Sequence, residues 1–129
     1  MKSIFILFIL IVQLFALTAN KQNILKLQKE NIPIIDIRLP SEWKATGTIP
    51  GALKITFFTK NGINKNFLYE LKKNNIKKNS KFAIICRTGH RSKIATQILK
   101  NNNYKNVIDL EGGMFRLFKS LLKGINNGK

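Results

Sequence analysis

The only cysteine of the chain, Cys86, lies in a segment whose residue types suit the binding of an anion beside a thiol. The segment CRTGHRS, Cys86 to Ser92, places Arg87 and Arg91 close to the sulfur. The thiolate is the reactive form of cysteine, and nearby positive charge lowers the thiol pKa. Gly89 lets the backbone turn through conformations that other residues avoid. The pattern predicts a nucleophilic, low-pKa cysteine that faces a bound anion.

The flanking segments indicate where this loop lies. Residues 81–85 (KFAII) are an apolar run typical of a buried strand, and residues 91–101 carry apolar side chains at helical spacing. Between a strand end and a helix start, backbone N–H groups are unpaired and the helix dipole is positive, so anions and thiolates are stabilised there. In open α/β sheets, ligands bind outside the carboxyl ends of the strands. We therefore expect Cys86 to form part of such a site.

The remaining loop residues have alternative roles. We expect backbone N–H groups of the loop, through Ser92, to surround the sulfur. Arg87 either meets a bound dianion or faces solvent. Thr88 either donates its hydroxyl to the sulfur or caps the turn. His90, the only histidine, is either a titrating assistant or a surface residue. Arg91 either binds the anion or pairs with a carboxylate, for which Glu111 and Asp36 are the candidates.

Three blocks of this sequence resemble the rhodanese (sulfurtransferase) family. CRTGHR followed by Ser92 is similar to the family pattern C-x-x-G-x-R-S. Residues 34–55, IIDIRLPSEWKATGTIPGALKI, resemble D-x-R…E-[WYF]…G-H-I-P-G-A, with Asp36, Arg38 and Glu42 in place. Residues 110–114, LEGGM, resemble L-x-G-G-[IVM]. The chain departs from the pattern at Thr48, where the family usually has histidine, and at Leu117, where tryptophan is common.

The resemblance implies a fold and an activity. The fold would be α/β, a rhodanese-like domain with a central parallel sheet and helices on both faces. Cys86 would accept sulfane sulfur from thiosulfate or a similar donor, hold it as a persulfide, and pass it to a thiol or to cyanide. No cofactor is implied, and one cysteine with one histidine gives no support for a metal site. Asp36, Arg38 and Glu42 would support the structure.

Two other functions stay open at this point. One is a rhodanese-like sulfur carrier or docking module that is served by a protein donor. The other is a phosphatase or an arsenate-type enzyme on the same fold. Tyrosine phosphatases use a C-x5-R loop, whereas Cys86 and Arg91 form the shorter C-x4-R loop. The smaller loop favours a persulfide sulfur over a tetrahedral phosphate.

The N-terminus has the pattern of a secretory signal peptide. Lys2 precedes an apolar run from Ile4 to Leu17, followed by small and polar residues around Ala19. We predict a signal peptide over residues 1–19, a rhodanese-like domain over residues 20–129, and a periplasmic location. An uncleaved membrane anchor is the alternative, although the run is short for a membrane span.

The charge of the chain restricts its partners. The net charge is +17, with 23 basic and 6 acidic residues. The lysines are spread along the chain without interleaved aromatic residues, which indicates solvated surface lysines rather than a nucleic-acid site. We expect a small anionic sulfur donor and a thiol or cyanide acceptor as partners, and a monomer. Stable membrane contact is expected only if the N-terminal segment is retained.

Hydrophobic spacing predicts the remaining elements. Helices are expected over residues 23–31, 63–74, 91–101 and 113–123, with a short turn of helix after Pro40. Strands are expected over residues 32–37, 52–55, 81–85 and 107–110. The last helix is expected to stop at Gly124.

Overall fold

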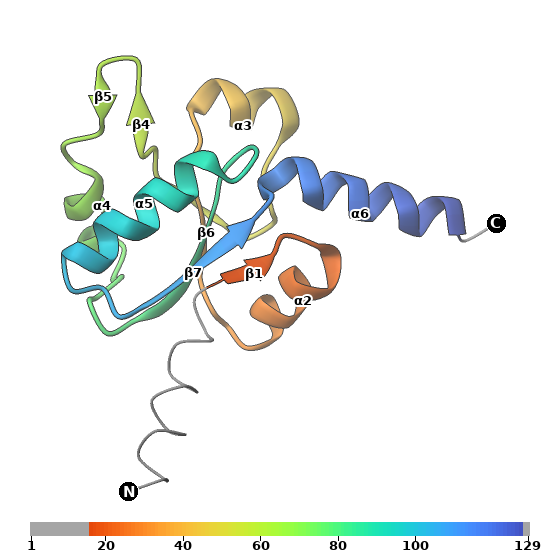
Figure 1. Ribbon diagram of the computed structural model, residues 1–129, viewed down its shortest axis with the longest axis horizontal. Helices are drawn as coiled ribbons and strands as arrows, with labels where there is room; N and C mark the ends of the chain where they lie inside the picture. Colours follow the sequence, from red (N-terminus) through yellow and green to blue (C-terminus); the bar gives the residue numbers. More distant parts are fainter. Residues whose placement is uncertain (1–15, 128–129) are drawn as a thin grey trace, which may run out of the picture.

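The computed structural model describes residues 16–127, which form one parallel sheet with helices packed on it (Figure 1). The sheet has the order β1-β7-β6-β2-β3, and every neighbouring pair is parallel. Its strands are β1 (Ala16–Thr18), β2 (Ile34–Asp36), β3 (Leu53–Lys54), β6 (Lys81–Ile85) and β7 (Asn106–Glu111). The helices are α2 (Lys21–Lys29), α3 (Pro40–Thr46), α4 (Phe67–Lys73), α5 (His90–Asn101) and α6 (Gly113–Asn127).

The central strand β6 shows how the apolar sequence makes two core layers. Successive side chains of a strand point to opposite faces of the sheet. Phe82 and Ile84 are fully buried in the layer that includes residues of α4 and α5. Ala83 and Ile85 are fully buried in the layer that includes residues of α2 and α6. An α/β fold with a central parallel sheet and helices on both faces is therefore confirmed.

The edge strand β1 lies within the segment that the sequence analysis assigned to a signal peptide. Its residues pair in parallel with β7, so that Ala16 lies opposite Asp109. Ala19 follows the strand, is fully buried, and donates its N–H to the Glu111 carbonyl at 2.8 Å. In the structure, residues 16–19 therefore pack with the sheet that the later residues form. Residues 1–15 lie outside the described residues, and export of the chain stays a prediction.

Two other differences have simple local causes. The helix expected over residues 63–74 begins only at Phe67, because Ile63 belongs to a small antiparallel hairpin of β4 (Phe58–Thr59) and β5 (Gly62–Ile63). The last helix passes through Gly124 and continues to Asn127, since glycine costs a helix interior only about 1 kcal/mol. Between residues 16 and 127, no helix is long and apolar enough to cross a membrane.

Candidate active site

Cys86 follows the last residue of β6, the central strand, at its carboxyl end. The side chain is fully buried. Its Sγ accepts hydrogen bonds from the backbone N–H of Gly89 at 3.1 Å and of Ser92 at 3.4 Å. Sγ also lies 3.5 Å from the Ser92 hydroxyl oxygen. The loop and the first turn of α5 therefore supply backbone donors to the sulfur, which is the arrangement that stabilises a negatively charged sulfur.

The turn that brings these donors to the sulfur depends on Gly89. This residue is the N-cap of α5 and has φ +98°, a value that side chains other than glycine rarely adopt. A Cβ at this position would lie 3.0 Å from the backbone nitrogen of Gly112. The Ser92 hydroxyl donates to the Gly89 carbonyl at 3.1 Å and closes the turn. Both the conformation and the space at this position therefore require glycine.

The N-terminus of α6 packs on the backbone of the segment Cys86 to Ser92, called the cysteine loop below. The Met114 N–H donates to the Cys86 carbonyl at 2.8 Å, and the Phe115 N–H donates to the Arg87 carbonyl at 3.0 Å. A Cβ at Gly113 would lie 2.5 Å from each of these two carbonyl oxygens. The unpaired N–H groups of a helix start need acceptors, and the loop carbonyls provide them. The start of α6 thereby holds the cysteine loop in place.

Arg91 is paired with a carboxylate that the sequence analysis did not choose. The candidates were Glu111 and Asp36, but the guanidinium forms a two-pronged ion pair with Glu42, at 2.6 Å to Oε1 and 2.8 Å to Oε2. The hydrogen bonds from Arg91 lower the pKa of Glu42, against the opposing effect of burial, and the same contact raises the pKa of Arg91. The pair joins the end of the cysteine loop to α3 and so places Glu42 beside the loop.

Asp36 and Arg38 form a buried pair beneath the site. The Arg38 Nε donates to Asp36 Oδ1 at 2.9 Å, and the Arg38 Nη2 donates to Oδ2 at 2.8 Å. Arg38 also donates to the hydroxyl of Thr46 at 2.9 Å and to the carbonyl of Gly47 at 2.8 Å. The Thr48 hydroxyl, at the position where the resemblance has histidine, donates to Asp36 Oδ2 at 2.6 Å. These bonds tie β2 to the end of α3.

The other predicted loop residues, Arg87, Thr88 and His90, are exposed. Within residues 16–127, no ion pair includes Arg87, and neither Thr88 nor His90 hydrogen-bonds to Cys86. His90 is the first residue of α5. Of the predicted loop residues, Gly89 and Ser92 therefore contact the sulfur of Cys86. Arg87 is a charged group that faces solvent.

Asp109 is a site residue that the sequence analysis did not select. It lies on β7, is 6% exposed, and its Oδ1 has no hydrogen-bond partner among the described residues. Burial raises the pKa of Asp109, while hydrogen bonding to the Ser92 side chain acts in the opposite direction. Ser92 therefore lies between this carboxyl and the sulfur of Cys86.

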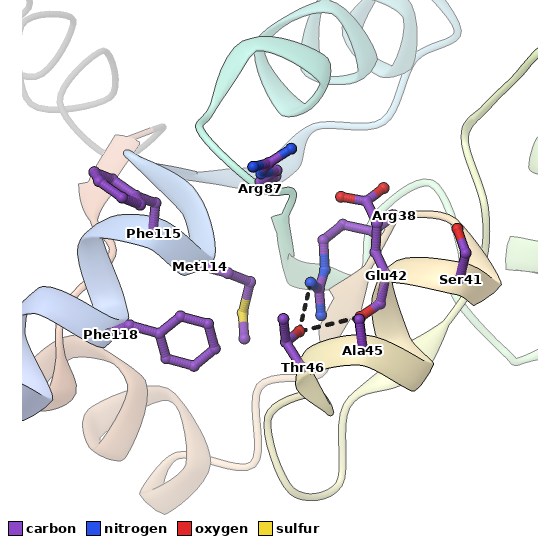
Figure 2. Close-up of a pocket in the computed structure, with 9 residues that line it drawn as sticks. All are labelled: Arg38, Ser41, Glu42, Ala45, Thr46, Arg87, Met114, Phe115 and Phe118. Carbon is purple, nitrogen blue, oxygen red and sulfur yellow. Dashed lines mark hydrogen bonds between the residues drawn. The ribbon is translucent and has the colours of Figure 1, made fainter.

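A cavity of about 390 Å³ opens beside the cysteine loop, between α3 and α6 (Figure 2). Arg87 lies at its loop side. Figure 2 shows Met114 and Phe118 of α6 facing Arg38 and Thr46 across the space. The full lining consists of Arg38, Ser41, Glu42, Ala45, Thr46, Arg87, Met114, Phe115 and Phe118.

The family model of the Rhodanese-like domain matches residues 20–119. The chain belongs to this family. The rhodanese-like domain is 33% identical, over 85 residues, to a protein named Sulfurtransferase from Allochromatium vinosum, a match that covers 66% of this chain and 70% of that protein. Family membership and this relative's name support sulfurtransferase chemistry at the level of the family.

Solved structures agree with the fold of the rhodanese-like domain. A rhodanese-like domain protein from Staphylococcus aureus superposes with a TM-score of 0.61 at 26% identity, covering 79% of this chain and 89% of that chain. The human single-domain sulfurtransferase superposes with a TM-score of 0.55 at 21% identity, covering 82% of this chain and 95% of that chain. At that identity, the human protein shows only that the fold is shared.

Proposed function

We propose that the protein is a sulfurtransferase that carries sulfane sulfur as a persulfide on Cys86. The observation that supports this most directly is the pair of backbone N–H groups, from Gly89 and Ser92, that point at the buried Sγ at 3.1 and 3.4 Å. A thiolate and a persulfide anion both need such donors, because burial removes them from water. Donors that are already in position stabilise the charge without rearrangement.

The proposed reaction has two steps. The Cys86 thiolate attacks the outer sulfur of thiosulfate, an S–S bond forms on the enzyme, and the S–S bond of the donor breaks so that sulfite leaves with the electron pair. An acceptor then attacks the outer sulfur of the persulfide. With cyanide the products are thiocyanate and the free Cys86 thiolate. Both steps conserve atoms and charge, and neither needs an external oxidant or reductant.

The test is the intact mass of the purified protein. The mass is taken before thiosulfate, after thiosulfate and after cyanide, with Cys86→Ser treated in parallel. We expect the wild type alone to gain one sulfur atom, and we expect cyanide to remove it as thiocyanate. The same samples are alkylated with iodoacetamide, so that an accessible thiol is scored independently of sulfur transfer.

Other outcomes would contradict the proposal in different ways. A reactive Cys86 that takes no sulfur from small donors would favour the docking or carrier module served by a protein donor. Hydrolysis of phosphate esters, with inhibition by vanadate, would favour the phosphatase class. A Cys86 that resists alkylation under all of these conditions would show that the loop is a structural element.

A further inference from the structure

Five polar or charged side chains are buried among the described residues. Asp36 and Arg38 satisfy each other as the ion pair beneath the site. The other three are Ser92, Thr96 and Asp109, which belong to α5 and β7, the two elements beside the cysteine loop. A buried polar group costs free energy unless it has a hydrogen-bond partner. This second group therefore needs an explanation that the ion pair does not provide.

The register of the sheet places Asp109 on the same face as the cysteine. Its parallel partner on β6 is Ile84. Ile84 and Cys86 are two residues apart and belong to the buried layer that includes residues of α5. Val107 belongs to the same layer, so Asp109, two residues further along β7, also points to this face. The carboxyl and the sulfur therefore lie on one face of the sheet, beneath α5.

Ser92 contacts both groups from the first turn of α5. Its Oγ lies 3.5 Å from the Sγ of Cys86, and its side chain hydrogen-bonds with Asp109. The Ser92 hydroxyl hydrogen is already in use, because it is donated to the Gly89 carbonyl at 3.1 Å. A hydroxyl has one hydrogen and two lone pairs. Toward Asp109 the Ser92 Oγ can therefore only accept, and the carboxyl has to supply the hydrogen.

The surroundings of Asp109 favour a carboxyl that keeps its proton. The side chain is 6% exposed, and Oδ1 has no partner among the described residues, although an ionised carboxylate would need several donors. Burial raises the pKa of Asp109, and Glu111 on the same strand adds to this effect, whereas Lys93 and Lys100 of α5 oppose it. Strand β1, on the other side of β7, has no titratable side chain.

A charged sulfur gives a further reason for a neutral carboxyl. An ionised Asp109 would place a second negative charge on the face that carries the thiolate or persulfide of Cys86, and like charges at one site oppose each other. The cation that responds to the charge of Cys86 is Arg91, and it is already paired with Glu42. The arrangement is therefore most stable when only the sulfur is charged.

We propose that Asp109 is a positioning residue that acts as a neutral carboxylic acid, donating its O–H to Ser92 Oγ and so keeping the Ser92 hydroxyl on Gly89 and the Ser92 N–H on the sulfur. Ionisation reverses this hydrogen bond, because a carboxylate can only accept. The Ser92 hydroxyl then turns away from Gly89, and the turn around Cys86 loosens. The inference rests on the proposed sulfur transfer and deepens it by adding regulation by pH at the same site.

Infrared spectroscopy of the full chain tests the protonation state. A protonated carboxyl has a carbonyl band that a carboxylate lacks, and hydrogen bonding changes the frequency of this band. At neutral pH we expect such a band in the wild type, its loss in Asp109→Asn, and a shifted band in Ser92→Ala. Glu111→Gln, which removes an exposed carboxyl from the same strand, should keep the band. Absence of the band, or an unshifted band in Ser92→Ala, would overturn the proposal, whatever the reactivity of Cys86.

Alkylation of Cys86 by iodoacetamide measures the effect on the sulfur. Asp109→Asn offers an amide N–H to Ser92 at every pH. Its rate should stay within about twofold of wild type while the carboxyl band is present, and should exceed wild type roughly 3- to 10-fold once the band has titrated away. Asp109→Leu has a similar size but no donor, so it should react roughly 3- to 10-fold more slowly than wild type at neutral pH.

A double variant shows whether the effect passes through Ser92. In the Ser92→Ala background, Asp109→Leu should cause no further decrease, because the accepting Oγ is absent. Equal rates for wild type and Asp109→Leu would overturn the proposal. So would an Asp109→Asn rate that stays in constant proportion to wild type at every pH, or an equal effect of Asp109→Leu with and without Ser92 Oγ. If thermal unfolding shows that Asp109→Leu does not fold, Asp109→Asn decides. Neither measurement uses a sulfur donor, so failure of sulfur transfer alone would leave these results unchanged.

Discussion

At the scale of single residues, Arg87 and Arg91 lie in the same loop and carry the same charge, but they differ in their hydrogen-bond partners. Arg91 is held by two hydrogen bonds to Glu42, whereas Arg87 is exposed and lines the cavity. An arginine that is already paired has little left to offer a ligand, while an unpaired one can approach an anion. We therefore propose that recognition of the donor depends on Arg87 and that stability of the loop depends on Arg91.

The first prediction concerns Arg87→Ala. We expect the apparent KM for thiosulfate to rise roughly tenfold, because one charge-assisted contact with the donor is lost. Steady-state kinetics with cyanide as acceptor measures this effect. Lys123→Ala removes the same charge from an exposed site on α6 and should leave KM unchanged. An equal KM for wild type and Arg87→Ala would remove Arg87 from donor binding.

The second prediction concerns Glu42→Gln. Because Arg91 lowers the pKa of Glu42 in the folded protein, the ion pair contributes stability above the unfolded pKa, and that stability is lost as pH falls through the folded pKa. We expect the variant to be less stable than wild type by about 1 kcal/mol at pH 7. The difference should disappear in strong acid. Urea unfolding between pH 3 and pH 7 gives the free energy of unfolding of both proteins. If the two free energies differed by the same amount at every pH, the stabilising role of the Glu42–Arg91 ion pair would be contradicted.

The third prediction concerns Asp109→Asn, for which the pH dependence has the opposite sign. Burial raises the pKa of Asp109, so the stability conferred by its protonated form is lost as pH rises through the folded pKa. Among the nearby charges, Glu111 raises this pKa, whereas Lys93 and Lys100 lower it. The neutral variant should gain stability relative to wild type from pH 3 to pH 7, by about 1 kcal/mol at neutral pH. The same urea series tests this, and a variant that is less stable at every pH would contradict it.

At the scale of elements, the contact between α6 and the cysteine loop depends on the absence of a side chain at Gly113. The residue has φ +64°, and a Cβ would meet two backbone carbonyl oxygens at 2.5 Å. Backbone atoms cannot move aside as a flexible side chain can. The helix and the loop must therefore separate if this position is filled.

The fourth prediction follows from that contact. Gly113→Ala should destabilise the protein by about 3 kcal/mol and should reduce sulfur transfer, because the loop loses its support. Gly124→Ala is the control, since its Cβ would meet nothing within 4 Å and its backbone is helical. That variant should be slightly more stable than wild type, by up to about 1 kcal/mol. Urea unfolding and the thiocyanate assay measure both effects, and similar results for the two variants would show that the Gly113 contact is unimportant.

Elements with strong local patterns were predictable from the sequence, and those that depend on distant pairing were not. The run KFAII and the helix after it were expected close to their observed positions. Asp36 and Arg38 were expected as structural support, and they form a buried ion pair. The hairpin of β4 and β5 has only two residues in each strand, so it has no periodicity to detect. Strand β1 was hidden because an apolar N-terminus satisfies the pattern of a signal peptide equally well.

The partners of charged residues were the least predictable part of the site. Glu111 and Asp36 were the expected partners of Arg91. The actual partner, Glu42, lies far from Arg91 in the sequence, and no local pattern indicates their contact. The packing of α3 against the loop decides that pairing. The contact of Asp109 with Ser92 was unpredictable for a related reason, because its burial beside Ser92 depends on how α5 covers the sheet.

At the scale of the whole molecule, the parallel sheet includes residues that precede residue 20. Without β1, strand β7 would become an edge strand with unpaired backbone groups, although its residues from Val107 to Leu110 are all buried in the complete domain. Exposed edges of this kind tend to pair with other chains. The first four described residues are therefore part of the fold.

The fifth prediction tests this boundary. A chain that starts at Asn20 should be less stable than one that starts at Ala16, by at least about 2 kcal/mol, because several backbone hydrogen bonds and the burial of Ala19 are lost. Urea unfolding gives the free energy, and light scattering detects association through the uncovered edge. Equal stability and equal solubility of the two chains would show that β1 is dispensable.

The pairing of β1 with β7 also determines when the fold can be completed. Among the described strands, the first lies against the last, with Ala16 opposite Asp109, and non-local parallel pairs form slowly. During synthesis, residues 16–18 leave the ribosome long before their partner exists. The sheet therefore stays open along that side until residues 106–111 have been synthesised, and a chaperone that binds extended apolar segments could bind residues 16–18 throughout that interval.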